Sequence, residues 1–186
     1  EEWLQTEWPE LRVYCASVTE QYATINLAGP NARALLASLT DMDVSREAFP
    51  FMTWREGRVA DLPARIFRVS FTGELSYEIN VPANYGMDLW NACVTAGEKL
   101  GLAPFGTEAL HVLRAEKGYI AIGQDTDGTV TPIDLGMSGL VSKKKDFLGK
   151  RSLARADMTA PGRREYVGLL TTNPQEVLPE GAHIVE

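Results

Sequence analysis

The amino-acid sequence predicts an α+β fold with antiparallel sheets and packed helices. Several short segments alternate apolar and polar residues, as strands with one buried face do. Two longer segments carry apolar residues at the spacing of an amphipathic helix. Short turns join neighbouring strand segments, which favours antiparallel hairpins over the parallel pairs of a doubly wound sheet. The composition, 45% hydrophobic and 23% charged in 186 residues, is that of a soluble globular domain.

The first predicted elements are a strand pair and a short helix. Residues 11–17 and 23–27 alternate apolar and polar side chains, and we expect them to pair as a hairpin across residues 19–21. Gly29-Pro30 ends the second strand. Apolar residues then recur at helical spacing and predict a short helix. They are Ala32, Leu35, Leu36 and Leu39.

A second hairpin is expected in the middle of the chain. Residues 41–57 contain Asp, Pro and Gly and predict a loop, and residues 58–62 and 64–71 predict two strands separated by Pro63. The turn at residues 72–74 leads to a returning strand with one apolar and one polar face. The apolar face of the returning strand consists of Tyr77, Ile79 and Val81, and its polar face of Ser76, Glu78 and Asn80. The preceding strand would place Phe67, Val69 and Phe71 together.

Two further helices are predicted, over residues 84–100 and 107–117, each followed by a glycine that can end it. The apolar stripe of the first is Leu89, Trp90, Cys93, Gly97 and Leu100, and the inward side of the second is Leu110, Val112 and Leu113. Residues 125–129 predict a turn-rich loop, residues 147–156 a short helix, and residues 166–170 a strand. We expect residues 1–160 to belong to one domain and residues 161–186 to begin a second, a β-barrel.

The net charge of −7 argues against nucleic acid or an anionic membrane surface as a partner. The sequence has no apolar run long enough to span a membrane and no signal peptide, which predicts a cytoplasmic protein. Cys15 and Cys93 lie in apolar periodic segments and are expected to be two buried thiols. His111 and His183 have no partners at metal-ligand spacing, so no metal site is expected.

Catalytic residues are not identifiable from the sequence. It has no dinucleotide-binding glycine motif and no phosphate-binding loop, and it shows no nucleophile with a partnered base. The chain starts at Glu1 without an initiator Met and ends just after His183, so we expect a part of a longer protein, truncated at both ends.

Glu78 is the residue whose chemistry suggests a binding site. A carboxylate on a polar strand face is either solvated or binds a ligand with adjacent donors, such as the N–C–N edge of a pterin ring, through charge-assisted hydrogen bonds. Phe71 and Tyr77 would then supply flat apolar contacts to the ring. Arg114, on the helix at residues 107–117, either extends to solvent or contacts the glutamate tail of a folate.

These residues lie in motifs that resemble the aminomethyltransferase (glycine-cleavage T-protein) family. Residues 67–79, FRVSFTGELSYEI, resemble its GYTGExGFEI signature. Residues 113–118, LRAEKG, and 123–125, GQD, resemble the end of its long helix and the turn that follows. Its two later signatures are matched by residues 131–136, TPIDLG, and 146–150, DFLGK. The order of the motifs is the family's, and the resemblance covers about residues 11–186.

Within that superfamily the sequence looks most like the alpha subunits of heterotetrameric sarcosine oxidases. The resemblance implies a folate-dependent oxidoreductase, in which flavin elsewhere oxidises sarcosine and this module transfers the one-carbon unit to tetrahydrofolate, giving 5,10-methylenetetrahydrofolate. FAD, FMN and NAD are then expected only in other parts of the enzyme, and the other subunits are expected partners. By the same resemblance, Glu78 binds the pterin edge, Phe71 takes the ring-contacting position of the family's Tyr, and Arg114 stands near the folate tail.

The sequence departs from the family at two positions that matter for binding. The family's Tyr before Thr-Gly-Glu is Phe71 here, which removes a hydroxyl, and an Arg-Asp pair in the long helix is Leu110-His111. The family's acidic residue that faces the reacting nitrogen would lie before residue 1, so this chain alone is expected to be inactive. Three alternatives stay open: a dimethylglycine or sarcosine dehydrogenase domain, a stand-alone aminomethyltransferase, and a non-catalytic folate-binding or scaffold module.

Overall fold

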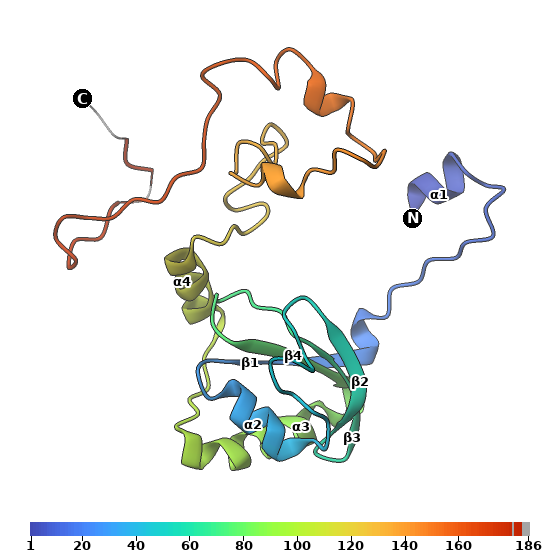
Figure 1. The fold of residues 1–186 in the computed structure, drawn as a ribbon, viewed down its shortest axis with the longest axis vertical. Coiled ribbons are helices and arrows are strands. Elements are labelled where there is room, and N and C mark those ends of the chain that lie inside the picture. Colours follow the sequence, from blue (N-terminus) through green and yellow to red (C-terminus); the bar gives the residue numbers. More distant parts are fainter. Residues whose placement is uncertain (180, 184–186) are drawn as a thin grey trace. The chain divides into compact units, whose positions relative to one another are not determined.

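The computed structural model describes residues 1–179 and 181–183. The chain forms two compact units, residues 1–119 and 120–186. The first unit carries the sheet and the longer helices (Figure 1). The predicted α+β class is confirmed, because all strand pairs are antiparallel and the helices pack on the sheet. The predicted boundary near residue 161 stays a prediction, and residues 180 and 184–186 of the expected second domain lie outside the described residues.

The sheet has four strands in the order β1-β4-β3-β2. They span Tyr22–Ala28 (β1), Trp54–Val59 (β2), Leu62–Phe67 (β3) and Ser76–Pro82 (β4). β4 lies inside the sheet, paired with β1 along all seven of its residues and with β3 through Arg65↔Asn80, Ile66↔Ile79 and Phe67↔Glu78. Glu78 is therefore carried by one of the two inner strands of the sheet.

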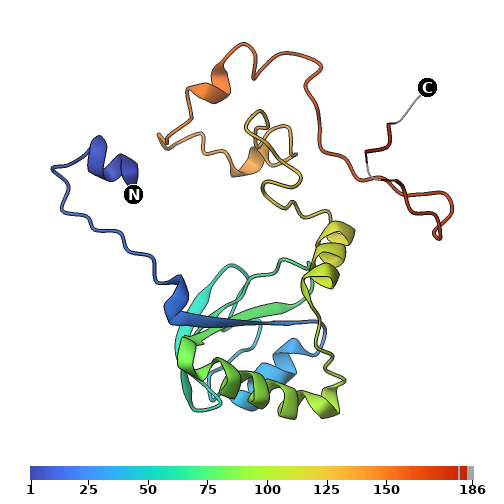
Figure 2. The ribbon, with the colours of Figure 1, turned by 180° about the vertical axis from the view of Figure 1, so that it is seen from behind.

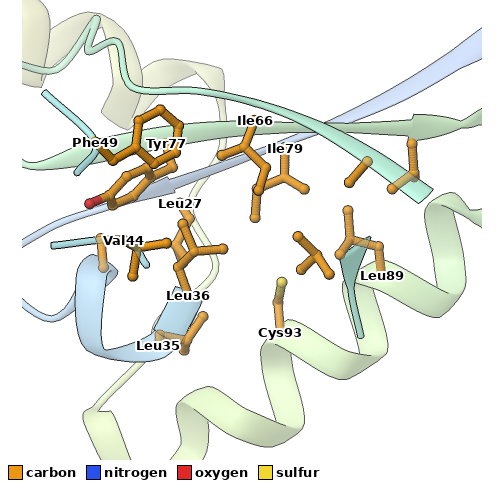
Figure 3. Close-up of a cluster of buried hydrophobic side chains, with 14 residues drawn as sticks. Leu27, Leu35, Leu36, Val44, Phe49, Ile66, Tyr77, Ile79, Leu89 and Cys93 are labelled. Carbon is orange, nitrogen blue, oxygen red and sulfur yellow. The ribbon is translucent and has the colours of Figure 1, made fainter. Parts of the chain in front are cut away.

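Two helices cover one face of the sheet (Figures 1 and 2). They are α2, Ala32–Leu39, and α3, Gly86–Gly97, which the short helix Glu98–Leu100 extends to Gly101. The core between sheet and helices is apolar (Figure 3). Its fully buried members include Leu36 of α2, Leu89 of α3, and Ile66, Tyr77, Ile79 and Val81 of the strands. Alternation along β4 places its odd-numbered side chains in this core and Glu78 on the opposite face.

The remaining helices are shorter or more exposed. α1 spans Glu2–Thr6 and buries no residue, and α4 spans Thr107–Lys117 and ends at Gly118, whose φ of 76° is left-handed. Short 3-10 turns lie at Thr19–Gln21, Ala83–Tyr85, Ser138–Leu140 and Ser152–Ala154. The predicted helices at 84–100 and 107–117 are confirmed, although Val112 is 53% exposed.

The predicted amino-terminal hairpin is wrong. Residues 11–17 form no strand, and β1 pairs with β4, about fifty residues further along the chain. The alternation of residues 11–17 is compatible with a strand that could pair with β1. β4 pairs with β1 instead, because it offers a fully apolar face and matches β1 over seven residues. Cys15 is consequently exposed, which corrects the expectation of two buried thiols, whereas Cys93 is buried.

Four local predictions are also corrected. β2 starts at Trp54, inside the predicted loop, and the turn before β3 is made by Ala60-Asp61 rather than by Pro63. Pro63 is accommodated because β3 pairs with β4 only through residues 65–67, so its missing N–H breaks no bond there. The helix expected at 147–156 is only the turn Ser152–Ala154, and residues 166–170 form no strand.

Candidate functional site

Glu78 lies at the centre of the sheet face that α2 and α3 do not cover. Its direct neighbours across the sheet are Asn26 of β1 and Phe67 of β3. Because residues directly opposite in antiparallel strands point to the same face, the three side chains are adjacent. Glu78 is half-buried, so its carboxylate is partly withdrawn from water while it still opens to this face.

The Glu78 carboxylate makes no hydrogen bond or ion pair to another of the described residues. An ionised carboxylate can accept about four hydrogen bonds. Partial burial reduces its solvation by water, which favours hydrogen bonds from another donor, above all a charged one. The sheet thus holds the Glu78 carboxylate at a fixed position, where it can accept further hydrogen bonds. Such a group suits a ligand that offers two adjacent N–H donors.

Two amide side chains flank the carboxylate and are held by hydrogen bonds of their own. The Oδ1 of Asn80 accepts a hydrogen bond from the hydroxyl of Thr24 at 2.6 Å, and the Oδ1 of Asn26 accepts one from the hydroxyl of Ser76 at 3.3 Å. Both bonds engage the amide oxygen, which leaves the NH2 group of each amide as a donor. The face therefore combines one acceptor with two donors.

An aromatic pair lies beside the polar group. The rings of Phe67 and Trp54 stack with centroids 6.2 Å apart and an interplanar angle of 25°. Trp54 is 52% exposed, so the pair offers an accessible flat surface next to Glu78. The sequence did not mark Asn26, Phe67 or Trp54 as site residues, because only the strand register brings them to Glu78 and Trp54 fell in a predicted loop.

Tyr77 lies on the other side of the sheet from Glu78. Its side chain is fully buried beside that of Phe49 (Figure 3), with ring centroids 5.8 Å apart. The Arg68 guanidinium lies 5.3 Å from the Tyr77 ring centroid. The Tyr77 hydroxyl has no hydrogen-bond partner in the described part of the chain. The structure therefore does not bring Tyr77 and Glu78 to one surface.

Phe71 lies in the irregular segment between β3 and β4 and is half-buried. This segment is held to β4 by Arg68, which donates to the carbonyl of Ser76 at 3.0 Å. Gly73, with φ of 81°, makes the reversal, and a Cβ there would come within 2.3 Å of the Lys117 side chain. Phe71 thus lies in a constrained turn, outside the regular alternation that was expected to place it with Phe67.

Arg114 lies near the carboxyl end of α4 and is only 5% exposed. Its Nη1 donates to the carbonyl of Tyr119 at 3.1 Å, just beyond the end of the helix. Extension into solvent, one of the two expectations for this residue, is therefore wrong. α4 is not part of the sheet, so the strand register does not fix the position of Arg114 relative to Glu78.

The second unit contains a tight ion pair. Arg163 donates to both carboxylate oxygens of Asp134, at 2.8 and 2.6 Å, and the backbone N–H and hydroxyl of Thr131 also donate to this carboxylate. The hydrogen bonds from Arg163, and then the one from the Thr131 N–H, hold the pKa of Asp134 well below its usual range. Because all three guanidinium nitrogens of Arg163 already donate within the unit, this arrangement fixes a loop rather than binding a ligand.

Within the described residues there is no group of three or more His, Cys, Asp or Glu side chains that could hold a metal ion. The described helices also include none that is long and apolar enough to cross a membrane.

The comparisons with known proteins agree with the motifs. The GCVT N-terminal domain matches residues 1–145. The sarcosine oxidase subunit alpha of Corynebacterium sp. (strain U-96) is 51% identical over the whole chain, and that of Rhizobium meliloti is 43% identical over 97% of it. The chain spans 19% and 18% of the length of these two relatives.

More distant relatives carry other names. An aminomethyltransferase from Streptomyces coelicolor is 36% identical, over 81% of this chain and 41% of the relative. The mitochondrial dimethylglycine dehydrogenase of Mus musculus is 32% identical over 89% of this chain. A solved heterotetrameric sarcosine oxidase from Corynebacterium sp. U-96 matches at a TM-score of 0.43 and 20% identity, covering 49% of this chain and 45% of that one.

Proposed function

Because the chain belongs to the family of GCVT N-terminal domains, we propose that it is the folate-binding part of a sarcosine oxidase alpha subunit. In this proposal the one-carbon unit released by sarcosine oxidation is transferred to tetrahydrofolate bound in the module, giving 5,10-methylenetetrahydrofolate. The observation that carries the proposal is the half-buried Glu78 carboxylate with unused acceptor capacity, in a chain 51% identical over its whole length to a sarcosine oxidase subunit alpha.

The residues on the open face fit a pterin. Glu78 would accept two hydrogen bonds from the N–C–N edge, and the amide NH2 groups of Asn26 and Asn80 would donate to ring nitrogen or oxygen atoms. The stacked rings of Phe67 and Trp54 would provide a flat apolar contact. Directional hydrogen bonds combined with an aromatic surface favour a planar heterocycle over a flexible amine.

The other predicted folate residues would take roles that follow from their motif positions and, for Tyr77, from its burial in the core. Phe71 would contact the ring from the turn before β4, without the hydrogen bond that a Tyr at this position would add. Arg114 would stand near the glutamate tail, with its guanidinium oriented by the Tyr119 carbonyl. Tyr77 would contribute from the core, by fixing the position of β4 and therefore of Glu78.

The activity of the whole protein requires more than this chain, which spans 19% of the Corynebacterium relative. The residue that faces the reacting nitrogen, the FAD, FMN and NAD sites and the contacts with other subunits are proposed to lie in other parts of a cytoplasmic enzyme. A dimethylglycine dehydrogenase domain and a stand-alone aminomethyltransferase share the folate chemistry, and they would differ in the source of the one-carbon unit.

The proposal is tested by calorimetric titration of the protein with tetrahydrofolate, comparing the wild type with Glu78→Ala. Loss of the charge-assisted bonds is expected to weaken binding by about 1.5–3 kcal/mol, or more than about tenfold. Glu74→Ala is the matched control, since Glu74 is an exposed carboxylate in the turn only four residues away.

Equal affinities of wild type and Glu78→Ala would remove Glu78 from the site. Absence of binding in both, with intact circular dichroism spectra, would instead support the scaffold alternative. Loss of binding in both the Glu78 and the Glu74 variants would indicate a general charge effect rather than a specific contact.

A further inference from the structure

The two edge strands of the sheet, β1 and β2, differ in how well their sequences protect them against pairing with another strand. β2, at one edge, carries three charged side chains in six residues, Arg55, Glu56 and Arg58. β1, at the other edge, is YATINLA, seven residues without a charge or a proline. Natural proteins protect free strand edges with charges, prolines or bulges, because unprotected edges pair with other strands. β2 has this protection and β1 lacks it.

One hydrogen bond shows which backbone N–H and C=O groups of β1 point toward β4 and which point away from the sheet. The N–H of Gly29 donates to the carbonyl of Leu75 at 2.9 Å, so the groups of Leu27 and Ile25 also point toward β4, because they alternate with period two. The N–H and C=O groups of Thr24, Asn26 and Ala28 therefore point away from the sheet. In the described part of the chain no backbone group bonds to these outward positions.

A groove of about 610 Å³ runs along this free edge. One wall is residues 24–31, and the other is formed by α3, the segment that follows it and the start of α4. Trp90, Val94 and Leu102 contribute apolar surface to it, and Trp90 is 43% exposed although it lies on the predicted inner stripe of its helix. A groove between an edge strand and a helix is the shape that receives an extended peptide by strand addition.

We propose that the β1 edge binds an extended strand from the same longer polypeptide, outside the 186 residues of this chain. The added strand would pair with the outward groups of Thr24, Asn26 and Ala28. Side chains on one of its faces would pack against Trp90 and Val94, and those on the other would extend the face that carries Glu78. The occupant is assigned to the same polypeptide because the chain spans only 19% of relatives to which it is 51% identical.

The test uses the 15N-labelled chain and overlapping peptides of roughly 15 residues, long enough for one strand, that tile the remainder of the Corynebacterium subunit alpha. At least one peptide is expected to slow amide hydrogen exchange at Thr24, Asn26 and Ala28 while leaving β2 unchanged. In Thr24→Pro the outward N–H is missing without loss of a bond to β4, and affinity for that peptide should fall more than about tenfold.

Thr24→Val is the matched variant, because it loses the hydroxyl bond to Asn80 but keeps the backbone N–H. It is expected to bind the peptide within about twofold of the wild type, a change inside the usual range for an exposed site. Failure of every peptide to bind, or equal binding by Thr24→Pro, would overturn the proposal. So would concentration-dependent protection of β1 without peptide, which would assign the edge to a second copy of the chain.

Discussion

Adjacent residues of β4 have separate roles. Glu78 faces the open side of the sheet, and Tyr77 is fully buried on the other side, against Phe49. The period of two along a strand dictates this separation, whatever the two residues do in other proteins of the family. A ligand held by Glu78 therefore meets Asn26, Asn80 and Phe67 before it meets Tyr77.

Removal of the buried hydroxyl of Tyr77 is not expected to destabilise the fold. A buried polar group without a partner costs roughly 1–3 kcal/mol, so Tyr77→Phe is expected to leave the free energy of unfolding unchanged or raise it by up to about that amount. Urea denaturation monitored by fluorescence measures it. A clear loss of stability in Tyr77→Phe would show that the hydroxyl has a partner in solution.

The buried thiol of Cys93 makes the free energy of unfolding depend on pH. Burial raises the pKa of its thiol from 9.0 to about 11. The folded thiol therefore stays neutral while the unfolded thiol ionises, so its contribution to stability is complete below about pH 9 and is lost as pH rises toward 11. The free energy of unfolding should fall more steeply between about pH 9 and 11 in the wild type than in Cys93→Ala.

The exposed Cys15 is the control for this effect. Cys15→Ala should retain the full pH dependence, and a thiol reagent should modify Cys15 before Cys93. Equal slopes in the wild type and in Cys93→Ala would contradict the buried, neutral thiol.

At the scale of elements, α3 binds the sheet through one face only. Leu89 is fully buried in the core (Figure 3). Met87 on the same helix is 68% exposed. Leu89→Ala is expected to lower the free energy of unfolding by about 2–5 kcal/mol, because it removes buried methyl groups and leaves a cavity. Met87→Ala should change it by less than about 0.5 kcal/mol. Similar losses in both variants, measured by urea denaturation, would contradict this packing of α3.

The strand pairing shows what the local pattern of apolar and polar residues could not predict. The two faces of residues 76–81, the α2 helix and the two long helices follow from periodicity, and the structure confirms them. Pairing of β1 with β4 does not follow, because residues 11–17 had the same alternation as a true strand. Periodicity tells which face of a segment is apolar but not which distant segment provides the matching face.

At the scale of the whole molecule, the two compact units differ in what holds them together. Residues 1–119 contain the apolar core, whereas the described residues after 119 form only the 3-10 turns Ser138–Leu140 and Ser152–Ala154. In the second unit Asp134 links Thr131 to Arg163, which also donates to the carbonyls of Thr129 and Asp157. This polar network joins segments about thirty residues apart in sequence.

Asp134→Asn is expected to speed proteolysis within residues 120–186 by several-fold at neutral pH, because it removes the charge that binds Arg163. Asp157→Asn is the matched control, since its carboxylate pairs with Arg155 on the exposed surface and should matter little. Mass spectrometry of the fragments locates the cleavages. Equal rates in the two variants would show that the network does not hold this unit.

The lowered pKa of Asp134 extends this prediction to acid. The folded carboxylate stays ionised to lower pH than an unfolded one, so its contribution is present above the ordinary pKa of 3.8 and is lost as pH falls below that value. The amide proton of Thr131, which donates to this carboxylate, should therefore titrate with a midpoint below 3.8 in NMR spectra.

The sequence by itself determined the α+β class, the family motifs and the choice of Glu78, because these depend on residue type and on short-range spacing. Only the tertiary structure decided that Asn26 and Phe67 stand beside Glu78, that Tyr77 faces the core, and that β1 has a free edge. The physical reason is that strand register is fixed by matching whole apolar faces across the sheet, which involves residues far apart in the chain.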